Sequence, residues 1–597
     1  MKKQKKKNLS KMLVYFKDYK FIYILCFLIM LITDFGIVIY GGLIGDATQS
    51  LINKKIDNAV KLLILYFIIV IVNNLLNRFR EYLSRKSQIK ISRKIGYDTY
   101  NKAMKLPAYA YEEMSSGEII NRITNDTETI VGSIDELMDI LAYVFAASVL
   151  LIYIYINSYL LGIEITIFLI LFSFVTGYFQ KKLKTIKKDK KKVIDEYTSL
   201  TNESIRGYRE IKTLGIIKNI QNDVSSIIKS LLNKSIKENN IIVISNLVSQ
   251  IFRGMLEVGV FLTCAILIGK DKLSISFFIA MTYYIYQYTY IIQAVTDFGK
   301  RYQELDVSMS RINEILFNEK YEDVKYGNNA LDNIKGVIKF NNVSFSYPNE
   351  KEILNNFNIT FEPNKKIAIV GSSGEGKSTL FNVGKSTLFN LITRVFDVKE
   401  GLITLDDINI KDLTEESLRK SISIIRQEPF IFNRTILENF KLIDPKVTLK
   451  EVKKYCKMAC IDEYIESLPK KYDTILGEGG VNLSGGQKQR LSIARTLLKK
   501  SKVILFDEAT SALDNESQRY IKDSIDALAH DHTVLIVAHR LSTIVDADII
   551  YVIKNGEVFD HGTHEYLMKN CEFYQNLYTT EDKAIKWYNL FYILLMC

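Results

Sequence analysis

Residues 371–379 read Gly371-Ser372-Ser373-Gly374-Glu375-Gly376-Lys377-Ser378-Thr379 and follow an apolar run at 367–370. They match the pattern G-x-x-x-x-G-K-[ST], which predicts a strand, a glycine-rich turn and the start of a helix. The glycines let backbone N–H groups surround a phosphate chain, Lys377 neutralises phosphate oxygens, and the Ser378 hydroxyl binds Mg²⁺. The stretch therefore predicts a site for a nucleotide's phosphates.

A direct repeat begins inside this stretch: the seven residues 376–382 read GKSTLFN, and residues 384–390, eight positions later, repeat them letter for letter. In the second copy Thr379 stands where the pattern needs a glycine, so only the first copy completes it. The pattern thus favours Lys377 over Lys385. Eight additional helical residues would lengthen the helix by about 12 Å and rotate its later face by about 80°. A packed core would not absorb that change, so we expect part of the repeat to loop out.

The composition divides the chain into two halves. A length of 597 residues predicts several domains. The apolar residues before about position 300 fall in long blocks. The net charge of +12 would suit a nucleic-acid-binding protein. Many of the lysines, however, lie in the first 20 residues, directly ahead of an apolar block, as in the cytoplasmic flank of a membrane span.

Six apolar segments are long enough to cross a bilayer. An even number places both termini on one side, and the Lys- and Arg-rich segments 78–105 and 181–237 place that side in the cytoplasm. The fold prediction for 21–317 is an all-α six-helix transmembrane bundle with long cytoplasmic helical extensions, after a basic N-terminus at 1–20. The spans are predicted near 21–44, 59–76, 137–156, 159–179, 241–268 and 274–298.

Two groups of polar residues in this half each allow two interpretations. The segments 117–126 and 203–214 lie near the cytoplasmic tips and are either docking turns or solvated helix ends. Asp34, Arg253 and Glu257 fall at membrane depth, where ionisable groups are costly. They are either structural, with Arg253 and Glu257 paired on one helix, or part of a polar translocation path.

A linker at 318–336 leads into a domain at 337–580, where short β runs alternate with helical patterns, as in an α/β P-loop NTPase. A buried strand at 503–506 ends in Asp507, placed to hold Mg²⁺ through water, and Glu508, placed to activate the attacking water. The run 483–487, LSGGQ, predicts a second anion site at a helix start. Two phosphate sites so far apart predict a head-to-tail dimer with ATP between the chains.

These motifs and their order resemble the ABC transporter superfamily, specifically an exporter-type half-transporter with its membrane domain fused ahead of an ABC ATPase. The resemblance implies that Tyr347 stacks on adenine, that Gln427 contacts Mg²⁺, and that His539 contacts the γ-phosphate. It also implies that 511–514 crosses the dimer interface, and that coupling helices lie near 108–116 and 205–215 and touch 477–480. The predicted catalytic residues are Glu508, His539 and Gln427; the metal ligands are Ser378, Gln427 and Asp507; the nucleotide-binding residues are Tyr347, 371–379, Ser484, Gly485, Gly486, Gln487 and Asp514.

The sequence thus predicts an ATP-driven exporter of amphipathic cargo (drug, lipid or peptide), which uses ATP and Mg²⁺ in a bacterial plasma membrane. A homodimer is expected, and a heterodimer stays open. The alternatives are a membrane protein that the repeat has disabled for hydrolysis and an importer of the same architecture; the spans argue against a soluble ATPase acting on nucleic acid. The apolar tail at 581–597 is too short to span a bilayer, and is either an interfacial anchor or a disordered end.

Overall fold

The computed structural model describes residues 10–317, 320–347, 352–371, 387–477, 480–507, 519, 522–523, 525–526, 528–537, 544–554 and 556–579. The chain divides into two compact units. The first comprises Met1–Met104 and Ser116–Lys320, and the second comprises Lys105–Ser115 and Tyr321–Cys597. This division separates a helical membrane domain from an α/β domain, as the sequence predicts.

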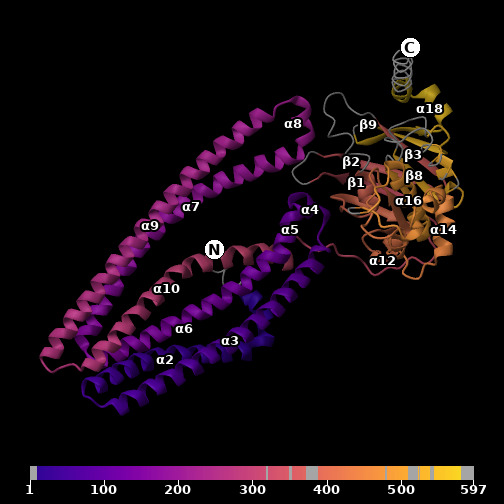
Figure 1. Cartoon of the computed structure of the whole chain (residues 1–597). Coiled ribbons are helices and arrows are strands. Elements are labelled where there is room, and N and C mark those ends of the chain that lie inside the picture. Colours follow the sequence, from indigo (N-terminus) through magenta and orange to yellow (C-terminus); the bar gives the residue numbers. More distant parts are fainter. Residues whose placement is uncertain are drawn as a thin grey trace. The chain divides into compact units, whose positions relative to one another are not determined.

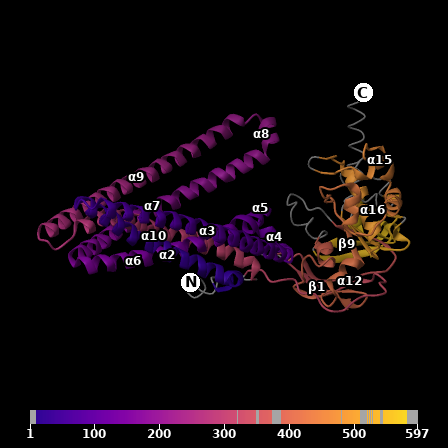
Figure 2. The ribbon, with the colours of Figure 1, turned by 60° about the horizontal axis from the view of Figure 1, so that its bottom comes forward.

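The first unit is entirely helical among its described residues, and α7 and α9 run side by side with α8 at their shared end (Figures 1 and 2). Its elements are η1 (Leu13–Tyr19), α2 (Lys20–Ile52), α3 (Ile56–Ala103), α5 (Ser116–Asn121), the π-helical η2 (Arg122–Asp126), α6 (Thr127–Asn157), α7 (Tyr159–Arg206), α8 (Tyr208–Leu214), α9 (Ile217–Gly269) and α10 (Ile275–Leu316).

Several of these helices are much longer than a bilayer requires. With 48 residues each in α3 and α7 and 53 in α9, they reach roughly 70–80 Å at 1.5 Å per residue, against about 30 Å of hydrocarbon. Within the described part of the chain, five helices are long and apolar enough to cross a membrane: Ser10–Ile52, Ile56–Ala103, Ser116–Asn157, Tyr159–Arg206 and Ile217–Gly269. The sixth predicted span falls on α10, whose side chains at 289–297 lie outside the described residues, and it remains a prediction.

A buried arginine ties η2 to α10 within this unit. Arg122 donates to Glu118 and Glu314, both at 2.8 Å, and to the Arg311 carbonyl at 2.9 Å. Both ends of η2, Arg122 and Asp126, are 5% exposed. The segment 117–126 thus anchors its buried charges inside the bundle, while Glu118, Thr124 and Asn125 remain exposed on its other side.

The second unit contains two sheets. The four-stranded sheet has the order β2-β1-β4-β5, and the six-stranded sheet has the order β10-β9-β3-β8-β7-β6. In the larger sheet β9, β3, β8, β7 and β6 are parallel. Strands buried on both faces read as continuous apolar runs, as in β7 and β8. The strands are β1 (Ile338–Phe345), β2 (Leu354–Phe361), β3 (Lys366–Gly371), β4 (Glu400–Leu405), β5 (Ile408–Asn409), β6 (Ile422–Ile425), β7 (Val503–Asp507), β8 (Thr533–Val537), β9 (Ile549–Lys554) and β10 (Glu557–Gly562).

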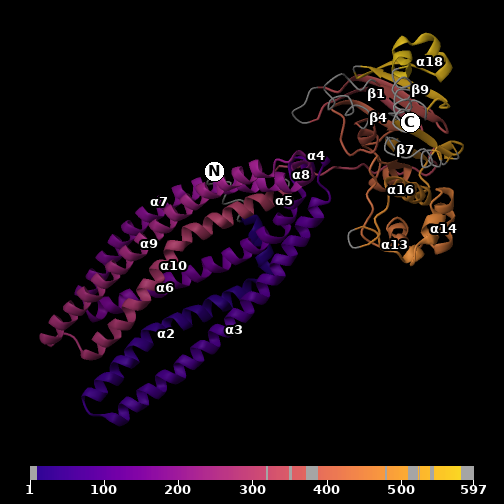
Figure 3. The ribbon, with the colours of Figure 1, turned by 45° about the horizontal axis from the view of Figure 1, so that its top comes forward.

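Short capped helices surround the sheets. Within this unit α13 and α14 lie at one end and α18 at the other (Figure 3). Capping boxes at Thr435, Thr448 and Ser484 fix where α13, α14 and α16 begin. The helices are α12 (Glu415–Ser421), α13 (Ile436–Lys441), α14 (Leu449–Met458), α15 (Asp462–Ser467), η3 (Lys471–Asp473), α16 (Gly485–Lys499) and α18 (His564–Asn570), with a further helical segment at 387–392.

The short helix α4 (Ala108–Glu113) clusters with the second unit, although its sequence interrupts the membrane domain. The Tyr321 hydroxyl donates to Glu113 at 3.0 Å, and the rings of Tyr109 and Tyr321 lie 5.9 Å apart. This is the segment for which the resemblance implies a coupling helix. The other implied coupling helix, near 205–215, coincides with α8.

Candidate nucleotide site

The parallel sheet brings motifs from distant parts of the chain to one edge. Val537, at the end of β8, pairs with Ile369 of β3 on one side and with Asp507 of β7 on the other. Ile425, which ends β6, pairs with Phe506. Because parallel strands end at the same edge, the chain segments that follow β3, β6, β7 and β8 all leave the sheet together. Ligands of open α/β sheets bind outside this carboxyl edge.

Three predicted site residues are described at or directly after this edge: Gly371, Gln427 and Asp507. Asp507 is the last residue of β7 and is 7% exposed. A buried carboxylate held at a strand end fits Mg²⁺, a hard cation that prefers oxygen ligands. Other predicted residues lie outside the described residues: Ser372, Ser373, Gly374, Glu375, Gly376, Lys377, Ser378, Thr379, Glu508, Asp514 and His539.

Tyr347 lies just after β1, in an aromatic cluster. Its ring makes edge-on contacts with Phe345 and Phe396, with both pairs of ring centroids 5.0 Å apart. Its hydroxyl and that of Thr387 lie 3.0 Å apart and share a hydrogen bond. The sequence predicts Tyr347 but misses Thr387, because Thr387 belongs to the copy of the repeat that fails the phosphate-loop pattern.

The predicted second anion site at 483–487, here called the signature, forms the start of α16. Ser484 is the N-cap: its hydroxyl accepts from the Gln487 amide at 3.3 Å, while the Gln487 side chain accepts from the Ser484 amide at 2.8 Å. Ser484 and Gly485 are exposed, and Gly486 is buried. The helix start thus presents its first residues to solvent, where an anion can reach them.

Contacts along α16 fasten it to the segment that carries Gln427. The Gln489 side chain donates to the Gln427 carbonyl at 3.1 Å, and Arg495 donates to the Phe430 carbonyl at 3.1 Å. Lys499 donates to the Ile422 carbonyl at 2.8 Å, and burial, followed by the nearby Arg419 charge, lowers the pKa of Lys499 to about 8. The signature helix and the Gln427 segment are therefore held together as one structural element.

Comparison with known proteins supports this architecture. The family described as the ABC transporter transmembrane region matches residues 22–292, and the family described as ABC transporter matches residues 382–511. The chain is 31% identical over 548 residues to a Bacillus subtilis protein named "Putative multidrug export ATP-binding/permease protein YgaD", with 91% of both chains covered. It is 33% identical over 489 residues to the ATP-dependent lipid A-core flippase of Haemophilus influenzae (strain 86-028NP), with 80% of both covered.

A solved structure of a bacterial Atm1-family ABC exporter with ATP bound shares the fold. Its TM-score is 0.78 at 24% sequence identity, and the match covers 94% of this chain and 98% of that one. In that solved structure, a helical membrane domain and an α/β domain thus occur together in the same order as in this chain. The chain belongs to the ABC transporter family: it is an exporter-type half-transporter, with a membrane domain fused to an ABC ATPase domain, and it couples ATP hydrolysis to export.

Proposed function

We propose that this exporter works as a homodimer in which each ATP is enclosed between the sheet edge of one chain and the α16 start of the other. The observation that carries this proposal is the separate construction of the two anion sites. Gly371, Gln427 and Asp507 gather at the sheet edge, whereas Ser484 and Gly485 are exposed at a helix start. A half-transporter needs a second half, and an identical copy supplies both missing parts.

In this proposal each predicted residue has one task at the sheet edge. Tyr347 stacks on the adenine, and the phosphate-loop lysine neutralises the phosphate oxygens. Mg²⁺ would be held by Asp507, Gln427 and the serine that follows the phosphate-loop lysine, Ser378 by the sequence pattern. It would stabilise charge on the β- and γ-phosphates. Glu508 orients the attacking water, His539 contacts the γ-phosphate, and Asp514 contributes from the dimer interface. By the sequence pattern alone, the loop lysine is Lys377.

Closure of the ATPase dimer is proposed to drive alternating access. The helix α4 supports this proposal. It interrupts the sequence of the membrane domain but belongs to the ATPase unit, where Glu113 of α4 accepts a hydrogen bond from Tyr321. Hydrogen bonds join α16 to the segment that carries Gln427. A movement of Gln427 when Mg²⁺ binds would therefore also move the start of α16. Rigid-body rocking of paired elements around a fixed site is the usual form of such transitions.

The proposed cargo is amphipathic, and the proposed location is a bacterial plasma membrane with both termini in the cytoplasm. The names of the relatives mention multidrug export and lipid A-core. At membrane depth, Arg253 and Glu257 form an ion pair at 3.0 Å on α9, with Arg253 5.3 Å from the Tyr286 ring centroid. Charged groups beside aromatic and apolar surface suit a cargo with both polar and apolar parts.

The test is Mg²⁺-dependent ATP hydrolysis by the purified chain in lipid, beside Glu508→Gln. The proposal expects hydrolysis by the full chain that the Glu508→Gln variant lacks, together with ATP-dependent uptake of an amphipathic dye into inverted membrane vesicles. Equal hydrolysis by both chains would contradict the role of Glu508. ATP-dependent loss of dye from preloaded inverted vesicles would instead indicate import.

A further inference from the structure

The structure places the described end of the second copy of the repeat in the core of the second unit. The described helix at 387–392 begins in the second copy and continues past it. Its apolar side chains belong to the buried cluster that includes residues of β1, β2, β3 and β4: Leu388, Phe389 and Leu391 are each 0% exposed and Ile392 is 1% exposed. Thr387 is also 0% exposed. This inference rests on the proposed ATP site and concerns which copy builds it.

The residues that follow each copy explain why the second one occupies the core. After the second copy the chain continues with Leu391, Ile392 and Thr393, which fill buried positions. The corresponding residues after the first copy are Val383, Gly384 and Lys385. Gly384 would leave the Ile392 position without a side chain, and Lys385 would bury a charge at the Thr393 position. The first copy therefore cannot replace the second in the core.

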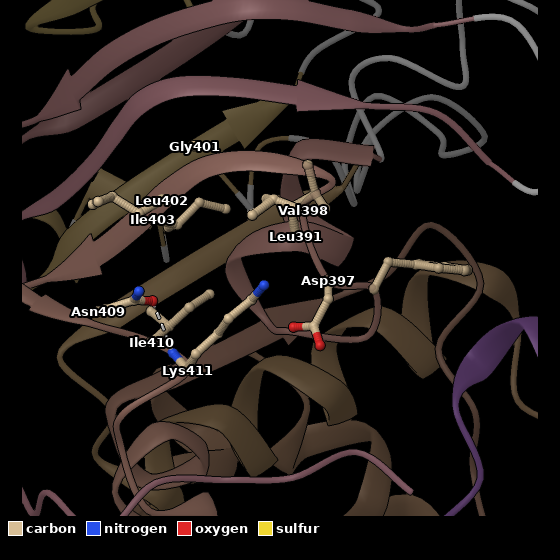
Figure 4. A pocket seen from close by; sticks show the side chains of 10 residues that line it. Leu391, Asp397, Val398, Gly401, Leu402, Ile403, Asn409, Ile410 and Lys411 are labelled. Atoms are coloured by element: carbon tan, nitrogen blue, oxygen red, sulfur yellow. Dashed lines mark hydrogen bonds between the residues drawn. The ribbon is translucent and has the colours of Figure 1, made fainter. Parts of the chain in front are cut away.

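The connection beyond the helix fixes the same register. The Val395 amide donates to the Asn390 carbonyl at 2.8 Å, and the buried Arg394, at φ +51°, donates to Asp397 at 2.9 Å and to the Lys325 carbonyl at 2.6 Å. Figure 4 shows Leu391 lining a small pocket with Val398 and Ile403. The helix end is thus locked to β4, and a shift by eight residues would break every one of these contacts.

Two further observations connect the second copy to nucleotide binding. Thr387 shares a hydrogen bond with Tyr347, the residue proposed to stack on adenine. The ABC transporter family matches from residue 382 onward, so its match includes all of the second copy and only Asn382 of the first. Thr387 stands two residues after Lys385, as Thr379 stands two residues after Lys377.

We propose that the second copy forms the nucleotide site, so that Lys385 and Ser386, rather than Lys377 and Ser378, contact phosphate and Mg²⁺. All four residues lie outside the described residues, and the assignment comes from the packing of the residues that follow Lys385. In this arrangement the turn between Gly371 and the glycine before the lysine grows from four residues (372–375) to twelve (372–383). A threefold longer loop disfavours closure by only about fivefold, which ATP binding tolerates.

The test measures binding of trinitrophenyl-ATP to the full chain in lipid, comparing Lys385→Ala with Lys377→Ala. The two substitutions change the same residue type in the same local sequence, so each is a matched control for the other. We expect Lys385→Ala to weaken binding at least tenfold and Lys377→Ala to weaken it less than threefold. The opposite ranking, or equal losses, would overturn the proposal.

A chain with one copy separates this inference from the proposed function. Deleting Val383–Asn390 or residues 376–383 produces the same sequence, here called the single-repeat chain. If neither this chain nor the full chain hydrolyses ATP, the proposed function fails. If the full chain hydrolyses ATP and Lys377→Ala weakens binding more than Lys385→Ala, the proposed function stands and the inference about the second copy fails. If only the single-repeat chain binds trinitrophenyl-ATP, both fail for the full chain. Binding by both, with the expected ranking of the lysine variants, supports both.

Discussion

The two copies of GKSTLFN, at 376–382 and 384–390, are identical in sequence and differ only in their neighbours. Upstream residues favour the first copy, because Gly371 stands at the spacing that a phosphate loop requires. Downstream residues favour the second, because Leu391 and Ile392 continue it into the core. A short motif therefore does not determine its own structure; the side chains that must be buried beside it decide which copy is used.

The energies involved favour the downstream neighbours. Lengthening a glycine-rich turn threefold costs about 1 kcal/mol in loop closure. Replacing buried Ile392 by a glycine would cost several times more, roughly 3–5 kcal/mol, through lost burial and a cavity. On this proposal the cost of changing the core exceeds the cost of a longer turn, so the core sets the register.

The largest expected difference in activity between the copies concerns the serine that would bind Mg²⁺. We expect Ser386→Ala to lower Mg²⁺-dependent ATP hydrolysis by about a hundredfold, since a metal contact to the transferring phosphoryl group contributes several kcal/mol. Ser378→Ala is the matched control and should lower the rate less than threefold. Hydrolysis rates of both purified variants in lipid decide the point, and a larger loss for Ser378→Ala would assign the metal to the first copy.

The larger of two expected differences in stability concerns the phenylalanines of the two copies. Phe389 is 0% exposed in the core, so Phe389→Ala should lower the free energy of unfolding of the ATPase domain by about 3–5 kcal/mol. The same substitution at Phe381, in the copy that we place outside the core, should cost less than about 1 kcal/mol. Thermal unfolding of both variants measures the difference, and similar losses would show that both copies are packed.

The smallest expected effect concerns the hydroxyl of Tyr347. Tyr347→Phe keeps the ring and removes the hydrogen bond to Thr387, so the ATPase domain should lose about 1 kcal/mol of stability. The single-repeat chain should lose the same amount, because its one threonine occupies the same position. Denaturant unfolding of the four chains provides the comparison. If Tyr347→Phe lowers stability only in the single-repeat chain, Tyr347 does not form the hydrogen bond to Thr387 in the full chain, and the proposal is contradicted.

Much of the architecture is readable from the sequence because it depends on long, regular patterns. Apolar blocks predict the long helices, and the apolar run ending in Asp507 predicts a buried strand of a parallel sheet. The edge that gathers Gly371, Gln427 and Asp507 follows from such strands once they are paired. The family resemblance, drawn from motif order, is confirmed by the matches at 22–292 and 382–511.

Features that depend on tertiary packing are harder to predict. The sequence leaves 117–126 open between a docking turn and a solvated helix end, and it does not show that Arg122 is buried with Glu118 and Glu314 accepting its hydrogen bonds. Glu314 lies far along the chain, on α10, so no local pattern shows this pairing. Thr387 is missed for the same reason: its partner Tyr347 is distant in sequence, and the local pattern points to the other copy.

The most direct test of this account is to compare ATP affinity and hydrolysis between the full chain and the single-repeat chain under identical conditions. If the second copy forms the site behind a lengthened turn, the full chain should bind ATP within about tenfold of the single-repeat chain, in line with the loop-closure cost, and should hydrolyse it. A full chain that neither binds nor hydrolyses ATP, beside an active single-repeat chain, would contradict the account and show that the repeat disables this exporter.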